Sequence, residues 1–281
     1  MTRAIRVKAF AKINLSLHVQ GVRPDGYHEL RTVFQSIALF DKLTIRPRPG
    51  PFELTCDDPA CPTDDTNLIS RAAVVAWRAR RREGSPRNVA VHLQKRIPMQ
   101  AGLGGGSSDA AAALRVFAQL WHVNKVQLRH FAGQIGADVP YFLVGGRVLG
   151  AGRGDRLARL PDLPRSHVVL VVPAFGVSTQ RAFAWWDRDG HHGHRAPYND
   201  LEAPVAKRHP EIARIVDELH RLGAARAAMS GSGSAVFGLF GSAGAAKTAA
   251  ARIRGRRRRV EIVRTLTRTE CQHLPPSEPI G

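Results

Sequence analysis

The chain has few of the residues that would direct it to an oxidising compartment or a membrane. Only three of its 281 residues are cysteine, and their spacing resembles neither a disulfide framework nor a zinc knuckle. No uninterrupted apolar run approaches the roughly 18 residues that a membrane helix needs. The first ten residues alternate charged and apolar side chains, which favours an initial strand over a secretory signal. We therefore expect a cytoplasmic protein with free thiols and no membrane partner.

Acidic residues are also scarce, and the formal net charge is +19. Such a balance usually suggests nucleic acid, an anionic membrane or an acidic ligand. Only seven of the 42 basic residues are lysine, however, and the arginines are scattered along the whole chain, a pattern that compositional bias also produces. The clusters at 78–82 and 256–259 lack the aromatic residues that stack on bases. Solvated faces are the favoured interpretation, and the histidine run at 191–194 is interpreted as an incidental surface loop.

Hydrophobic periodicity divides the chain into two parts. In the first part, alternation predicts strands near residues 13–20, 43–45 and 88–95, and apolar faces predict helices after residues 67 and 109 and over 128–135. The second part has the order strand, helix, strand, strand, helix, strand, which is the split βαβ order of a ferredoxin-like layer. We therefore predict an α+β protein with domains at 1–160 and 161–281, in which 268–281 form a loose tail.

The strongest local signal is a glycine-rich loop between a predicted strand and a predicted helix. Its sequence is Pro98-Met-Gln-Ala-Gly-Leu-Gly-Gly-Gly-Ser-Ser108. Glycines let the backbone approach a ligand closely, and the free N–H groups of a helix start attract anions. The loop is not a Walker A motif, because no Gly-Lys-Ser/Thr follows, nor a Rossmann fingerprint, because Ser107 replaces the last glycine. It favours triphosphate binding over the alternative of a plain connecting loop.

Residues 98–112 resemble the second signature of the GHMP kinases, the family of galactokinase and of homoserine, mevalonate and phosphomevalonate kinases. The N-terminal signature and the C-terminal glycine turn of that family have counterparts in Ala9–Leu15 and Met229–Ser234. The turn departs from the commoner Gly-Thr-Gly form at Ser232, which keeps a hydroxyl. The resemblance implies two α+β domains, an ATP-binding one followed by a ferredoxin-like one, with the active site in the cleft between them. It also implies Mg²⁺ accompanying ATP.

The resemblance assigns catalysis to Lys12 and Asp138. A carboxylate must accept the proton of an attacking hydroxyl, and a nearby ammonium keeps that carboxylate ionised and offsets charge at the reacting centre. Without the resemblance, Lys12 reads as a surface lysine on a strand and Asp138 as a turn residue. No metal ligand is assigned, although Ser107 and Ser108 are candidates. The implied ATP contacts are Asn67, Leu68, Pro98, Met99, Gln100, Ala101, Gly102, Leu103, Gly104, Gly105, Gly106, Ser107 and Ser108.

Further matches, at residues 26–30, 136–140, 175–179 and 199–202, resemble the branch of the family whose acceptor carries a cytidine diphosphate. This resemblance makes His28 a contact to the base, places Tyr27 at the sugar or in a stack, and stacks Phe183 on the cytosine. Unaided, the first two would be hairpin residues and Phe183 a helix core residue. The implied substrate contacts are Asn14, Tyr27, His28, Thr179 and Phe183.

Two alternatives stay open at this point. One is a GHMP kinase with another acceptor, such as homoserine or a phosphomevalonate, against which the cytidine contacts argue. The other is a nucleic-acid-binding protein that kept the fold and lost the activity, which would explain the net charge but not the intact glycine loop. The sequence favours small-molecule partners and is compatible with a monomer or a weak homodimer.

Overall fold

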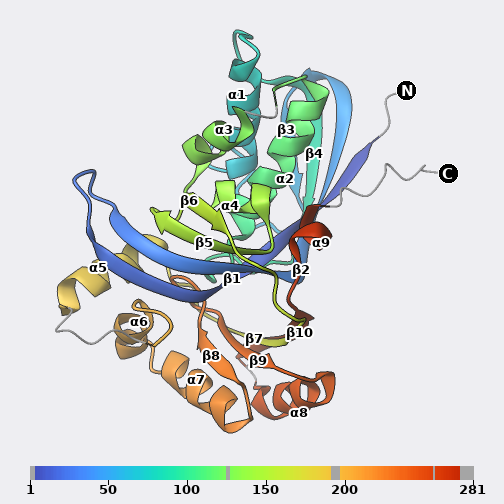
Figure 1. Ribbon diagram of the computed structural model, residues 1–281. Coiled ribbons are helices and arrows are strands. Elements are labelled where there is room, and N and C mark those ends of the chain that lie inside the picture. Colours follow the sequence, from blue (N-terminus) through green and yellow to red (C-terminus); the bar gives the residue numbers. More distant parts are fainter. Residues whose placement is uncertain (1–3, 125–126, 191–196, 256, 273–281) are drawn as a thin grey trace.

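A computed structural model describes residues 4–124, 127–190, 197–255 and 257–272, and it shows two sheets with helices packed on each (Figure 1). The predictions for the histidine run at 191–194, for Arg256 and for residues 273–281 fall outside this range. Among the described residues, no helix is long and apolar enough to cross a membrane.

The first sheet is organised by a long antiparallel hairpin. Its strands are β1 (Ile5–Val22), β2 (His28–Pro51), β3 (Glu53–Cys56), β4 (Arg87–Gln94), β5 (Arg147–Gly152) and β6 (Arg156–Arg159), and the helices packed on it are α1 (Leu68–Ala79), α2 (Gly105–Leu120), α3 (Leu128–Ile135) and α4 (Val139–Val144). The hairpin pairs β1 with β2. Because β2 is so long, β5 pairs with its first part and β4 with its later part. The hairpin therefore crosses the middle of the molecule in Figure 1.

The second sheet has the strand order β10-β7-β9-β8, with all neighbours antiparallel. Its strands are β7 (His167–Pro173), β8 (Arg226–Met229), β9 (Val236–Phe240) and β10 (Arg258–Arg264), and its helices are α5 (Thr179–Asp189), α6 (Glu202–Arg208), α7 (Glu211–Arg221) and α8 (Ala243–Ile253). This arrangement confirms the predicted ferredoxin-like layer. The first crossover carries α5, α6 and α7, whereas the pattern of the sequence predicted one helix there.

A third apolar core joins the two sheets. It contains Ile13 from β1, Ile37 from β2 and Leu170 from β7, and all three are fully buried. Leu17, farther along β1, belongs to the core beneath the helices of the second sheet. The hairpin is therefore shared by both halves of the molecule. The chain crosses from the first sheet to the second between residues 159 and 167, an interval that contains the predicted boundary.

The prediction of a loose tail from residue 268 is wrong for its first five residues. They form a short helix, α9 (Arg268–Gln272), which packs back on the first half. Glu270 accepts hydrogen bonds from the Arg264 guanidinium at 2.7 Å and from the Thr267 N–H at 2.9 Å. Gln272 donates to the Val144 carbonyl at 3.0 Å. The polar residues that suggested a solvated tail make these specific contacts instead, which composition alone does not reveal.

Candidate active site

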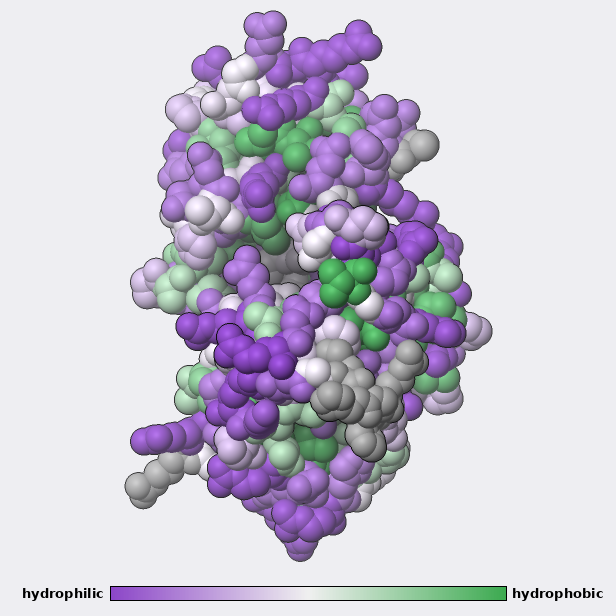
Figure 2. All heavy atoms as spheres, turned by 90° about the vertical axis from the view of Figure 1, so that its left-hand side faces the viewer, coloured by the Kyte–Doolittle hydropathy of each residue, from purple (hydrophilic) through white to green (hydrophobic). Residues whose placement is uncertain are grey.

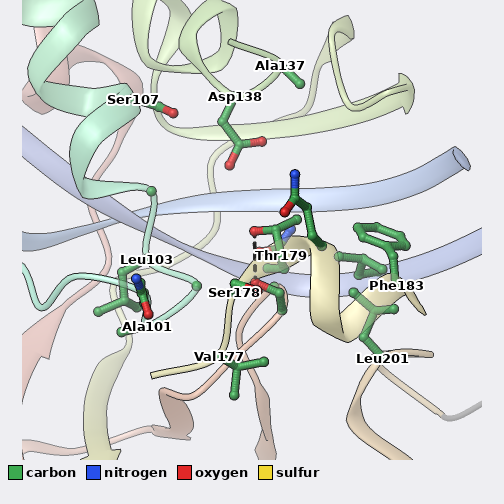
Figure 3. A pocket seen from close by; sticks show the side chains of 18 of the residues that line it. Ala101, Leu103, Ser107, Ala137, Asp138, Val177, Ser178, Thr179, Phe183 and Leu201 are labelled. Atoms are coloured by element: carbon green, nitrogen blue, oxygen red, sulfur yellow. Dashed lines mark hydrogen bonds between the residues drawn. The ribbon is translucent and has the colours of Figure 1, made fainter. Parts of the chain in front are cut away.

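A cleft with a cavity of about 840 Å³ is lined by residues of both halves. Figure 2 shows a hollow at mid-height on a mostly hydrophilic face. In Figure 3, Ser107 and Asp138 come from the first half and lie across the cavity from Thr179 and Phe183, which belong to α5. Every predicted site residue lines this cavity except Asn67 and Ser108. The fold thus gathers residues that lie more than 150 positions apart in the sequence.

Lys12 is held in the wall of the cavity by three polar groups. Its ammonium donates to Asn14 Oδ1 at 2.6 Å and to the Gly102 carbonyl at 2.9 Å, and it lies 3.8 Å from Asp138 Oδ2. The side chain is only 4% exposed, against 33% for Asp138. Burial lowers the pKa of Lys12, and the negative charge of Asp138 opposes that effect. The sequence-based reading of Lys12 as a surface lysine is therefore wrong.

Asp138 occupies the N-cap position of α4, yet its side chain makes no capping hydrogen bond. Aspartate at this position usually accepts a hydrogen bond from the backbone of the first turn. Here the turn is closed by the backbone instead, through a 3.1 Å hydrogen bond from the Val139 N–H to the Gly136 carbonyl. The carboxylate is left to face Lys12 at 3.8 Å. Figure 3 shows the Asp138 side chain directed into the cavity.

Two glycines of the loop are required by backbone geometry. Gly102 and Gly104 have φ values of +71° and +70°, which L side chains rarely adopt. A Cβ on Gly102 would lie 2.0 Å from the Ser230 carbonyl oxygen, and one on Gly104 would lie 2.6 Å from the Phe142 ring. Gly104 is also the N-cap of α2, and it offers no side chain to the free N–H groups of the first turn. Those groups and the helix dipole therefore make an anion site at the cavity wall.

Lys95 is a cavity residue that the sequence analysis missed. A Cβ on Gly105 would lie 3.0 Å from the Lys95 Nζ, so this glycine makes room for the ammonium beneath the loop. The ammonium donates to Asp41 Oδ2 at 2.5 Å and to Asp109 Oδ2 at 3.0 Å. Burial alone would lower the pKa of Lys95, but Asp109 and Asp41 outweigh it and raise the pKa. The ammonium is therefore held between two buried carboxyl groups beneath the start of α2. The signal in the sequence is weak, because it is one lysine at a strand end.

Asn67 and Ser108 are predicted ATP contacts whose side chains serve the fold. Asn67 caps α1, since its Oδ1 accepts from the Ile69 N–H at 2.8 Å while its Nδ2 donates to the Pro62 carbonyl at 2.6 Å. The buried Ser108 hydroxyl donates to the Phe10 carbonyl at 2.7 Å. Neither residue lines the cavity. A family signature does not separate such structural positions from neighbouring positions that face a ligand.

The predicted cytidine contacts lie together at the other end of the cleft, on the hairpin and α5. The His28 imidazole stacks on the Phe183 ring, with centroids 4.5 Å apart and planes 20° apart, and meets Trp186 edge-on at 5.5 Å. Tyr27 is 55% exposed, and the Arg153 guanidinium lies 4.7 Å from the centroid of its ring. Arg153 was not predicted. This end is therefore an aromatic wall with one cation beside it.

Hydrogen bonds fix the two remaining predicted substrate contacts. Asn14 donates from Nδ2 to the Thr32 hydroxyl at 2.7 Å, which leaves its Oδ1 oriented toward Lys12. The Thr179 and Ser232 hydroxyls lie 3.2 Å apart, so the start of α5 is tied to the C-terminal glycine turn. Asn14 is thus held by a residue of the neighbouring strand β2, and Thr179 by a residue 53 positions away in the sequence.

Comparison with known families and proteins gives matches over most of the chain. A family model described as the GHMP kinases N terminal domain matches residues 67–146, and one described as GHMP kinases C terminal matches residues 185–257. The chain is 38% identical over 286 residues to a 4-diphosphocytidyl-2-C-methyl-D-erythritol kinase of Desulfitobacterium hafniense, which covers 94% of this chain and 97% of the relative. It is 43% identical over 272 residues to the kinase of the same name from Solibacter usitatus, with coverages of 85% and 82%.

Solved structures with the same architecture agree with these matches. A crystal structure of 4-(cytidine 5'-diphospho)-2C-methyl-D-erythritol kinase superimposes with a TM-score of 0.77 at 35% identity, covering 93% of this chain and 99% of that one. A homoserine kinase from Cytophaga hutchinsonii superimposes with a TM-score of 0.69 at 18% identity, covering 96% and 97%. At that identity, the second likeness shows the fold alone.

Proposed function

The chain belongs to the GHMP kinases and, within them, to the 4-diphosphocytidyl-2-C-methyl-D-erythritol kinases, and from this premise we propose how its cleft performs the transfer. It uses ATP to phosphorylate the 2-hydroxyl of 4-diphosphocytidyl-2-C-methyl-D-erythritol, in the non-mevalonate route to isoprenoid precursors. The observation that carries the assignment of roles is the Lys12–Asp138 pair, which lies in the same cavity as the glycine loop and the aromatic wall.

The triphosphate of ATP lies against the start of α2. Gly102 and Gly104 bring the backbone close, and the uncapped N–H groups of the helix donate to phosphate oxygens. Leu68, which also lines the cavity, contacts the nucleotide, as do residues 98–101.

Asp138 is the general base. As the oxygen of the acceptor hydroxyl forms its bond to the γ-phosphorus, the proton of that hydroxyl passes to the Asp138 carboxylate, and the bond to the leaving ADP oxygen breaks. The Lys12 ammonium, 3.8 Å from the carboxylate, offsets negative charge at the reacting centre. Asn14 holds the ammonium in position, and Thr179 contacts the substrate from the opposite wall.

The donor set of the cavity fits a Mg²⁺ ion that arrives with ATP. Among the described residues, no group of three or more histidine, cysteine, aspartate or glutamate side chains is placed to hold a metal. Mg²⁺ commonly takes one or two protein oxygens together with phosphates and water, so a resident cage is not needed. Ser107, at the start of α2, would supply a hydroxyl oxygen, whereas the Ser108 hydroxyl is already used by Phe10. The ion neutralises charge on the phosphates when it is bound.

The aromatic wall recognises the cytidine, with Phe183 stacked on the base, His28 at its edge and Tyr27 at the sugar or in the stack.

We propose no nucleic-acid partner, since this wall serves a single nucleotide. A cytoplasmic location suits the three free thiols, at Cys56, Cys61 and Cys271. A monomer or a weak homodimer is the proposed state.

The test is ATP consumption that depends on the cytidylated acceptor. We expect ADP to form stoichiometrically with the phosphorylated product, and not with homoserine or phosphomevalonate in place of the acceptor. ADP release that is equal with and without the acceptor would overturn the proposal. Binding of an arbitrary DNA duplex with a sub-micromolar Kd at physiological salt would instead favour a nucleic-acid partner.

A further inference from the structure

Asp187 lines the cavity, and its side chain contacts His28, the residue predicted to contact the base. It lies four residues after Phe183 on α5, so both side chains are on one face of that helix. Its Oδ1 lies 2.8 Å from His28 Nε2, although the two residues are 159 positions apart in the sequence. The His28 side chain is 11% exposed, whereas that of Asp187 is 47% exposed. The carboxylate thus reaches the imidazole from the rim of the cleft.

This contact determines what the other ring nitrogen offers. An ionised carboxylate only accepts hydrogen bonds, so Nε2 of His28 must carry the proton. In the neutral imidazole, Nδ1 is then an acceptor. The hydrogen bond that His28 makes to another described residue uses Nε2, and Nδ1 makes none within that part of the chain. The Asp187 carboxylate at Nε2 and the edge of Trp186 hold the ring, so the acceptor has a fixed direction.

A fixed acceptor distinguishes the two pyrimidines. The exocyclic 4-amino group of cytosine donates hydrogen bonds, whereas the 4-oxygen of uracil only accepts them. The lone pair on Nδ1 lies in the plane of the imidazole, so a base that donates to it is nearly coplanar with the ring. Phe183, whose plane is 20° from that of His28, then lies nearly parallel to the base as well. The orientation of Phe183 is therefore the one that stacking on such a base requires.

We propose that Asp187 is a positioning residue that fixes His28 as a hydrogen-bond acceptor and thereby makes the site select cytosine over uracil. The inference rests on the proposed function, because it concerns the cytidine end of the same site. Its role differs from that of His28, since Asp187 acts through the imidazole and not on the base.

The experiment compares kcat/KM for the cytidine substrate and its uridine analogue in three proteins. Wild type should prefer cytidine by at least about tenfold. Asp187→Asn, whose amide can donate to Nε2 and release the other tautomer, should reduce that preference to about threefold or less, mainly through KM for the cytidine compound. Asp189→Asn is the matched control on the same helix: Asp189 pairs with Arg208 at 2.6 and 2.7 Å, away from His28, and its variant should keep the wild-type ratio.

The possible outcomes separate the two claims. Equal use of both nucleotides by wild type contradicts the proposed cytidine recognition itself. A selective wild type whose preference survives in Asp187→Asn, or is lost equally in Asp189→Asn, overturns only the role of Asp187. A second readout does not depend on turnover, namely the ¹⁵N shifts of the His28 imidazole. They should report an Nε2–H tautomer in wild type and a changed tautomer population in Asp187→Asn, and unchanged shifts would contradict the inference.

Discussion

The two ends of the cleft are built in different ways. At the phosphate end, the decisive features belong to the backbone: positive φ angles at Gly102 and Gly104, and uncapped N–H groups of α2. At the cytidine end, the features are side chains on the rim, including Tyr27 with 55% exposure. A backbone site tolerates few sequences, whereas a side-chain site can be changed one residue at a time. We therefore expect mutations at the phosphate end to reduce ATP binding or turnover, and those at the cytidine end to change how the acceptor is recognised.

The largest effect should follow from Asp138→Asn. The change keeps the size of the side chain and removes the proton acceptor, so kcat should fall by about 10²–10⁴-fold. Affinity for a non-hydrolysable ATP analogue should stay nearly constant, because the glycine loop is untouched. Steady-state kinetics and calorimetry measure the two quantities. If the variant kept more than about a tenth of the wild-type kcat, Asp138 would not be the general base.

A smaller effect should follow from Gly104→Ala, which tests the backbone at the phosphate end. The new Cβ would lie 2.6 Å from Phe142 and 3.2 Å from the Lys12 Cε, at a φ of +70°. We expect the affinity for the ATP analogue to fall by about tenfold or more, with a loss of about 1 kcal/mol or more in folding stability.

Gly106→Ala is the matched control for this variant. The Cβ would meet only Leu68, at 3.8 Å, and the φ is not positive. Its folding stability should be close to that of wild type, and its affinity for the analogue should fall less. Equal losses in the two variants would show that the left-handed backbone at Gly104 has no special part in binding.

The smallest effect should follow from Phe183→Ala at the cytidine end. Stacking tolerates any base, so kcat/KM for the cytidine and uridine compounds should fall by a similar factor, about fivefold to tenfold. His28→Ala should instead reduce the ratio of kcat/KM between the cytidine and uridine compounds, because it removes the side chain that hydrogen-bonds to the base. A Phe183→Ala variant that lost activity on the cytidine compound alone would contradict a purely stacking role.

The contrast between backbone features and isolated side chains also explains which parts of the site could be predicted from the sequence. The glycine loop could be recognised because turns, helix starts and backbone approaches depend on local residue types, and the strand and helix periodicity of the second half was sufficient for its topology. Lys12, Asp138 and the cytidine contacts depended on resemblance, since isolated charged residues carry no local signal.

Contacts between distant residues that no family signature covers could not be predicted from the sequence. Lys95 pairs with Asp41 across 54 positions, and His28 with Asp187 across 159. Helix α9 was missed for the same reason, because its hydrogen bond to Val144 spans 128 positions. Only the folded chain brings such partners together, and no pattern within a short window indicates them.

The apolar seam between the two sheets has a consequence for how this enzyme can change. Ile13, Ile37 and Leu170 bury the joint completely, so the angle between the halves is part of the folding core and does not behave as an adjustable hinge. Altering that angle would mean repacking the core. A new acceptor is more easily accommodated by replacing residues of the hairpin tip and of α5, which lie on the rim. A change of acceptor is therefore expected to involve the hairpin tip and α5, while the apolar core between the sheets stays the same.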